Sequence, residues 1–122
     1  MRLLLAEDNA TNVELFLAAL ETDGHEVTVE RDGPSARARA LRETFDLIVL
    51  DIQMPRLDGN AVCAELRAAG IRSPIVALSA AAQPSDIARG METGFDAYLT
   101  KPIRPDALRA AVRRYRPGEP SA

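Results

Sequence analysis

Four charged side chains stand directly after, or just beyond, short apolar runs of this sequence. Glu7 and Asp8 follow one run, Asp51 follows a second, and Lys101 lies just past another. Three carboxylates brought together make a hard, oxygen-rich site that suits Mg²⁺, which takes few protein ligands and keeps several waters. Without a cation their repulsion would raise at least one carboxyl pKa, and Lys101 alone cannot neutralise three negative charges. We therefore predict a metal site at these carboxylates.

Lys101 is the only lysine of the chain, and the other 14 of its 15 cationic residues are arginine. A crowded site built around one phosphoryl oxygen favours the compact ammonium of lysine over the wide fork of arginine. Chance would place the single lysine here about one time in fifteen. Pro102 follows it, and a cis X-Pro bond would turn the lysine inward. Composition thus supports a specific role for Lys101.

Five short apolar runs, bounded by turn-forming or polar residues, predict five strands. They span residues 3–6, 27–29, 47–50, 75–78 and 97–99. Several of these runs lack in/out alternation, as expected when helices cover both faces of a parallel sheet.

Helical spacing appears between the runs. In the first interval Val13, Phe16, Leu17 and Leu20 share a face, with Thr11 as the expected cap and Gly24 as the end. The other helices are marked by Pro34 with inward Ala36, Ala40 and Leu41; by Val62, Leu66 and Ala69 before Gly70; by Ile87 and Met91; and by Pro105, Leu108, Val112 and Tyr115.

Strands and helices in strict alternation predict an α/β fold, a (βα)5 doubly wound parallel sheet with the flavodoxin-like order 2-1-3-4-5. In that order the carboxyl ends of the central strands are neighbours, and the functional crevice of such sheets lies there. Ser79 would join the charged residues at this edge. We expect one domain over residues 1–116 and a flexible C-terminal tail over residues 117–122.

Composition narrows the function classes. The formal net charge of −3 offers no overall positive field for a polyanion, so we expect no nucleic-acid partner. The single cysteine, Cys63, cannot form an internal disulfide, which favours a reducing compartment. No apolar run approaches the ~18 residues of a membrane span, so we expect a cytoplasmic protein without a membrane partner.

Four motifs, in order, resemble the receiver domain of two-component response regulators (CheY-like). They are LLLAEDN at 3–9, LIVLDIQMPRLDG at 47–59, IVALSA at 75–80 and AYLTKP at 97–102. The resemblance covers residues 2–116. The EDN start with Asn12 is similar to receivers of hybrid histidine kinases.

The resemblance implies a role for each matching residue. Asp51 would accept a phosphoryl group from a histidine kinase or a histidine phosphotransfer protein, and Lys101 would pair with the phosphoryl charge. Mg²⁺ would be held by Glu7, Asp8, Asp51 and the backbone carbonyl of Gln53. Ser79 would donate its hydroxyl to a phosphoryl oxygen, with the N–H of Ala80 nearby, and Tyr98 would be the aromatic switch. The face formed by the fourth helix, fifth strand and fifth helix would signal to an unknown downstream protein.

The chain departs from the family pattern at two positions. Glu7 stands where Asp is frequent, and its extra methylene leaves room for a water between carboxylate and metal. Ser79 stands where Thr is common, and it keeps the hydroxyl.

Three other functions compete with this interpretation. A phosphohydrolase of the haloacid dehalogenase type needs an acid two residues after its nucleophile, and Gln53 cannot move that proton, so we expect no turnover enzyme. A flavodoxin needs a phosphate loop after its first strand, where Glu7 and Asp8 would repel phosphate. A degenerate, binding-only receiver would lack some of the chemical positions, and all five are filled here.

Overall fold

The computed structural model describes residues 1–81 and 83–115, along which five strands and five helices alternate as predicted. The elements are β1 (Arg2–Ala6), α1 (Ala10–Thr22), β2 (Glu26–Glu30), α2 (Gly33–Arg42), β3 (Leu47–Asp51), α3 (Gly59–Ala68), β4 (Ile75–Ser79), α4 (Pro84–Thr93), β5 (Ala97–Thr100) and α5 (Pro105–Arg113). The tail expected at residues 117–122 lies outside the described residues.

All strand pairs of the sheet are parallel, and the order β2-β1-β3-β4-β5 confirms the prediction. Leu5 of β1 stands between Val29 of β2 and Val49 of β3, so β1 and β3 are direct neighbours. The last residues of β1 and β3 therefore finish side by side, which places residues 7, 8 and 51 at one edge of the sheet.

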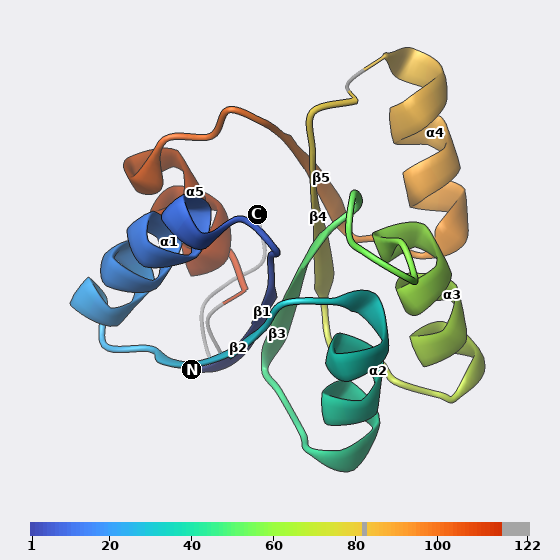
Figure 1. Ribbon diagram of the computed structural model, residues 1–122, viewed down its shortest axis with the longest axis horizontal. Helices are drawn as coiled ribbons and strands as arrows, with labels where there is room; N and C mark the ends of the chain where they lie inside the picture. The colour runs from blue at the N-terminus through green and yellow to red at the C-terminus, as the bar shows by residue number, and fades with distance from the viewer. Residues whose placement is uncertain (82, 116–122) are drawn as a thin grey trace.

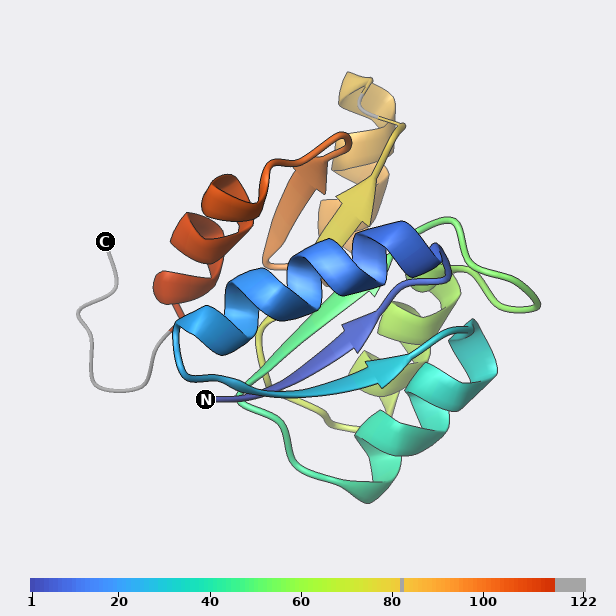
Figure 2. The same ribbon diagram turned by 60° about the vertical axis from the view of Figure 1, so that its left-hand side comes forward.

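Helices cover both faces of the sheet, with α1 and α5 on one side and α2, α3 and α4 on the other (Figure 1). Alternate residues of β1 enter different cores: Leu3 and Leu5 pack with Phe16 of α1, whereas Leu4 packs with Leu66 of α3. Figure 2 shows α1 lying across its face of the sheet. Burial on both sides explains why the strands read as continuous apolar runs.

The first helix begins earlier than predicted. Asn9 is its N-cap, and its Oδ1 accepts a hydrogen bond from the N–H of Asn12 at 2.9 Å. Thr11 lies inside the helix and is exposed, so its expected capping role is wrong. Asparagine caps at least as well as threonine, and here it stands at the residue where the chain leaves the strand. Gly24 follows the helix with φ of 82°, a left-handed conformation that ends it as predicted.

Three predictions about the apolar helix faces need correction. Ala36 and Ala40 of α2 are buried, but Leu41 is 46% exposed, because one residue around a helix turns the side chain by roughly 100° away from the buried face. In α5, Leu108 and Val112 are buried as expected, whereas Tyr115 lies past the helix end and still packs against the same core. Ala69 likewise follows α3 and is exposed. Across the described residues, none of the helices has the length and apolar character needed to cross a membrane.

Asp23 ties the end of α1 to α5. Its carboxylate accepts hydrogen bonds from Nη2 and Nε of Arg109 at 2.6 and 3.1 Å, and Nη2 of Arg113 lies 3.6 Å away. The hydrogen bond and charge of Arg109 lower the pKa of Asp23 to about 2. This ion pair therefore contributes to the packing of α5 against α1.

Replacing Asp23 with asparagine is expected to destabilise the protein at neutral pH and much less in acid. The folded pKa lies below the unfolded one, so the stabilisation is complete above about pH 4 and is lost as pH falls through about 2. Urea unfolding at about pH 7 and about pH 2.5 measures the difference. Asp106→Asn, at a more exposed pair with 3.4 Å to Arg104, is the control. An equal loss at both pH values for Asp23→Asn would contradict the ion-pair account.

Candidate functional site

The three predicted carboxylates meet at the carboxyl ends of β1 and β3. Glu7, Asp8 and Asp51 each offer an oxygen, and these oxygens all lie within 4.8 Å of one another. Glu7 is fully buried, Asp51 is 2% exposed and Asp8 is exposed. Two buried acids and one open to solvent make a cluster that a cation can reach from outside.

Lys101 reaches this cluster from the loop between β5 and α5. Its Nζ lies 2.7 Å from Glu7 Oε1 and 2.7 Å from Asp51 Oδ2, so one ammonium bridges both buried carboxylates. Its backbone N–H donates to the Ser79 carbonyl at 2.7 Å, and its bond to Pro102 is cis. The structure therefore brings the single lysine to the predicted place.

The remaining oxygens of the two buried acids have backbone partners. Glu7 Oε2 accepts from the N–H of Asn9 at 3.2 Å, and Asp51 Oδ1 accepts from the N–H of Gln53 at 3.0 Å. Both oxygens of Glu7 are thus engaged. Within residues 1–81 and 83–115 the Asp8 carboxylate has no hydrogen bond or ion pair, although its backbone carbonyl accepts from Arg31 at 3.0 Å.

Burial and neighbouring charges move the pKa values of the cluster in different directions. Burial raises the pKa of Asp51 to about 6, with a further rise from Glu7, and the hydrogen bond from Lys101 offsets only part of this. Burial also favours a higher pKa for Glu7, but hydrogen bonds with Lys101, Asp51 and Asn9 outweigh it, so the pKa of Glu7 is lowered. Burial opposes the charge of Lys101, and its two carboxylate partners raise its pKa. The single positive charge of Lys101 thus faces three carboxyl groups, as the sequence predicts.

A chain of hydrogen bonds runs from the cluster to Tyr98. Ser79, fully buried at the end of β4, accepts from Gln53 Nε2 at 3.1 Å and from the N–H of Ala81 at 3.0 Å. The half-buried Tyr98 donates its hydroxyl to the carbonyl of Ala81 at 2.6 Å. Ala81 therefore joins the serine to the tyrosine through its own backbone.

All the predicted site residues lie at or next to this edge of the sheet, and some have partners that the sequence did not reveal. The side-chain amide of Gln53 donates a hydrogen bond to Ser79, whereas the resemblance implies a role only for its backbone carbonyl. The amides of Asn9 and Ala81 also take part. Every residue except proline has a backbone N–H, so residue type does not indicate which of these groups donate to the site, and only the fold identifies them.

The donor set fits a small divalent cation. Carboxylate oxygens from three residues in a partly open cluster are the ligands that Mg²⁺ prefers, and the open side leaves room for its retained waters. Among the described residues the cluster consists of carboxylates, without the nitrogen and sulfur ligands typical of zinc.

Comparison with known proteins agrees with this geometry. The response regulator receiver domain family matches residues 3–113. The transcriptional regulatory protein DltR of Streptococcus agalactiae is 37% identical over 113 residues, which cover 93% of this chain and 50% of DltR. PhoP of Bacillus subtilis, the alkaline phosphatase synthesis transcriptional regulatory protein, is 38% identical, covering 92% of this chain and 47% of PhoP. The chain spans about half the length of these relatives.

Solved structures show the same fold. The receiver domain of the Francisella response regulator 1452 has a TM-score of 0.90 and 32% identity, over 93% of this chain and 94% of that one. The receiver domain of sensor histidine kinase PA1611 from Pseudomonas aeruginosa PAO1, solved with a magnesium ion coordinated in its active site cleft, has a TM-score of 0.85 and 36% identity, over 93% and 95% of the two chains. By sequence and by fold, this chain belongs to the response regulator receiver domain family.

Proposed function

We propose that the chain takes a phosphoryl group from a phosphohistidine donor onto Asp51, in a Mg²⁺-dependent reaction. The observation that carries the proposal is the position of Asp51, whose buried carboxylate lies 2.7 Å from the Lys101 ammonium among two further acids. A nucleophilic oxygen, a fixed positive charge and a site for a cation are what phosphoryl transfer requires, because positioning and charge neutralisation supply most of its catalysis.

In the proposed step an oxygen of Asp51 attacks the phosphorus of the donor. The new P–O bond forms as the P–N bond breaks, and the histidine leaves with the electron pair and takes a proton from solvent. Lys101 exchanges part of its contact with the carboxylate for a phosphoryl oxygen. Ser79 and the N–H of Ala80 supply hydrogen-bond donors to the other oxygens.

Mg²⁺ fits the proposal through the residues of the acidic cluster. Asp8, Asp51 and the carbonyl of Gln53 would hold the cation directly, and Glu7 would hold it through a water, for which its extra methylene relative to aspartate leaves room. When bound, the cation supplies positive charge to the transferring phosphoryl group. The protein's own part is to position these oxygens and to keep Lys101 beside Glu7 and Asp51.

Adding Mg²⁺ is expected to lower the pKa of Asp51, because a bound cation favours the ionised carboxylate. Protons and metal then compete, so the affinity for Mg²⁺ should fall about tenfold per pH unit below the metal-free pKa. NMR titration of the Asp51 side-chain carbon, with and without Mg²⁺, measures both effects. A carboxyl that titrates near 6 whether or not Mg²⁺ is present would rule out Asp51 as a ligand.

Ser79 and Tyr98 form the proposed switch. Ser79 accepts both of its hydrogen bonds, from Gln53 and Ala81, so its own O–H can donate to a phosphoryl oxygen, and a shift of Oγ toward that oxygen would pull on the N–H of Ala81. Ala81 then moves, and the hydroxyl of Tyr98 loses its acceptor. A population shift of Tyr98 would alter the face formed by α4, β5 and α5.

Gly90 of α4 leaves room for the ring of Tyr98 because it has no side chain. A Cβ there would lie 2.9 Å from Cδ2 and 3.1 Å from Cε2 of the Tyr98 ring. Gly90→Ala is therefore expected to displace the ring and to shift its NMR signals. The added methyl costs about 1 kcal/mol or more in overpacking, which outweighs much of the helix propensity that alanine gains.

The double-mutant cycle with Tyr98→Ala separates these effects. Once the ring is removed, Gly90→Ala should stabilise the protein by up to ~1 kcal/mol. Unchanged tyrosine signals in Gly90→Ala, or the same stability change in both backgrounds, would show that Gly90 does not control the ring.

The proposed reaction at Asp51 requires a phosphoryl donor and a partner that receives the signal. The donor is a histidine kinase or a histidine phosphotransfer protein, and the output is contact with a further protein or onward phosphoryl transfer. Gln53 in place of a proton-moving acid argues for a phosphoacceptor that assists its own reactions without multiple turnover. The buried, free Cys63 supports a cytoplasmic setting. The absence of a nucleic-acid partner and the hybrid-kinase subgroup stay predictions.

Intact mass after incubation with acetyl phosphate tests the function. We expect a gain of one phosphoryl group with Mg²⁺ and none with EDTA. Rapid release of phosphate over many turnovers, without an adduct, would favour the phosphohydrolase instead, and no reaction with either acetyl phosphate or a phosphohistidine donor would favour a binding-only receiver.

A further inference from the structure

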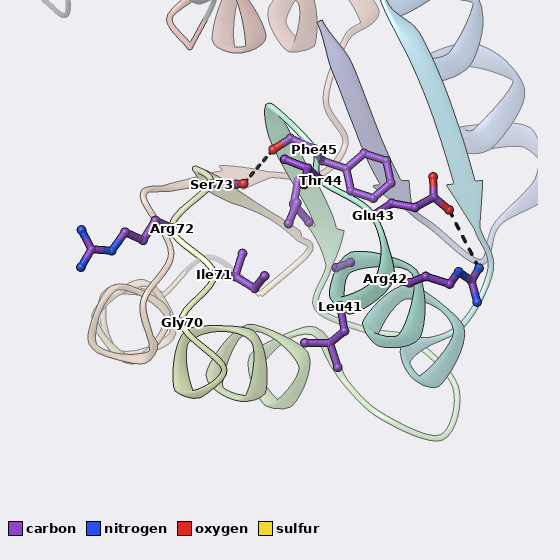
Figure 3. Close-up of a pocket in the computed structure, with 11 residues that line it drawn as sticks. Leu41, Arg42, Glu43, Thr44, Phe45, Gly70, Ile71, Arg72 and Ser73 are labelled. Carbon is purple, nitrogen blue, oxygen red and sulfur yellow. Dashed lines mark hydrogen bonds and ion pairs between the residues drawn. The ribbon is translucent and has the colours of Figure 1, made fainter.

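A hollow of about 300 Å³ opens at the end of the sheet opposite to Asp51. It lies between the C-terminal end of α2, the loop leading into β3 and the loop between α3 and β4 (Figure 3). Ile48 in its wall is the second residue of β3, whereas Asp51 is the last. An occupant of this hollow would leave the acidic cluster free.

The wall of the hollow is largely apolar. Phe45 and Ile48 are buried in it, and Leu41 and Ile71 extend toward it from opposite sides (Figure 3). Leu41 is one of three large hydrophobic side chains that are exposed in the described part of the chain, and it stands at the rim of this hollow. Covering Leu41 and filling the space beside Phe45 would remove apolar surface from water.

Positive charge surrounds the opening. Arg42, Arg39 and Arg2 share the single carboxylate of Glu43, at 3.9, 2.7 and 3.0 Å. On the other side Arg72 is exposed and makes no hydrogen bond or ion pair with the residues that the structure describes. Among the residues that line the hollow, two arginines therefore stand against one acid, while Glu30 and Asp46 nearby also hold Arg39 and Arg2.

The direction of the two outer arginines decides between kinds of occupant. Arg42 and Arg72 extend away from the hollow on opposite sides (Figure 3). A compact anion inside the hollow would leave at least one of them unused. A peptide segment that buries one side chain and continues in both directions places its neighbouring residues over both arginines.

We propose that this hollow receives a bulky apolar side chain from a segment of a partner protein, with acidic residues on both sides of it. The apolar side chain fills the space between Leu41 and Ile71, and the flanking carboxylates pair with Arg42 and Arg72. This docking surface is separate from Asp51, so the chain holds such a partner whether or not it is phosphorylated.

Titration of the isotope-labelled full chain with short peptides, followed by amide NMR spectra, tests the proposal. The probe is an acetylated pentapeptide in which a phenylalanine has two glutamates on each side. We expect saturable shifts at Leu41, Thr44 and Ile71. Replacing the phenylalanine with alanine, or the glutamates with lysines, should remove them.

Leu41→Glu and Arg72→Glu, both at exposed positions, should each weaken binding by ~5-fold. Arg89→Glu, an exposed arginine on α4, is the matched control and should bind normally.

Several results would overturn the proposal. They are the absence of saturable shifts at the hollow, equal binding of the lysine peptide, or unchanged binding by Arg72→Glu. Binding of 3-phenylpropionate as tight as that of the peptide would also overturn it, since the hollow would then be a site for small anions. Well-dispersed spectra of the variants confirm that they are folded.

Discussion

Asp51→Asn is expected to lose all phosphoryl incorporation and to be more stable than the wild type at neutral pH. The amide is not a nucleophile, so no acyl phosphate forms. It also removes a buried charge next to Glu7. Because burial raises the pKa of Asp51 to about 6, the ionised carboxylate destabilises the fold at pH values above this. We expect a gain of about 1–2 kcal/mol at pH 7 without Mg²⁺.

The stability gained by Asp51→Asn should depend on pH. The wild-type carboxyl is protonated in the folded state below about pH 6, so the advantage of Asp51→Asn should shrink as pH falls toward about 4. Mg²⁺ should stabilise the wild type more than the variant, which has lost one of the carboxylates of the cluster. Urea unfolding under these conditions measures the effect.

Asp58→Asn is the matched control for Asp51→Asn. Asp58 lies in the loop after β3 and caps α3, where its Oδ1 accepts from the N–H of Ala61 at 2.8 Å. Asparagine caps a helix equally well, so this variant should keep both its stability and its phosphoryl incorporation. Incorporation by Asp51→Asn at the wild-type level, or its loss in Asp58→Asn, would contradict the assignment.

Lys101→Met is expected to destabilise the protein and to slow phosphoryl transfer. Methionine is unbranched like lysine and only one atom shorter, but it leaves Glu7 and Asp51 without the ammonium that lies 2.7 Å from each. An uncompensated buried charge costs roughly 3 kcal/mol at pH 7. Loss of the charge that faces the phosphoryl group should slow the reaction by ~10²-fold.

Two comparisons separate these effects. The stability loss should decrease as pH falls below about 6, because Asp51 then takes up a proton and one of the two buried charges disappears. Lys101→Arg keeps the charge, so it should recover part of the stability, but its planar fork does not replace the ammonium between two oxygens, and the rate should stay low. A stability loss independent of pH, or a wild-type rate in Lys101→Met, would show that the lysine does not serve these carboxylates.

The fold could be predicted because its signals are local. Each buried strand is an uninterrupted apolar run, and each helix repeats apolar residues on one face. The alternation leaves few topologies, and these bring residues 7, 8, 51 and 101 to one edge of the sheet. Helix boundaries were less accurate: Thr11 and Asn9 both suit a cap, and only the exit from β1 decides for Asn9.

Other parts of the site depend on tertiary geometry that residue types do not encode. The engagement of both Glu7 oxygens, one by Lys101 and the other by the amide of Asn9, follows from how β1 and β5 end. The bond from the Gln53 amide to Ser79 depends on the path of the loop after β3. The collision of a methyl at Gly90 with Tyr98 arises where α4 packs on β5.

The most direct test of the central claim is to locate the phosphoryl group on the chain. After incubation with acetyl phosphate and Mg²⁺, reduction with borohydride converts an aspartyl phosphate into homoserine, which peptide mass spectrometry assigns to one residue. The account predicts homoserine at Asp51 alone, and none when EDTA is present. Homoserine at Asp8 or elsewhere, or stable phosphate on Ser79, would contradict it.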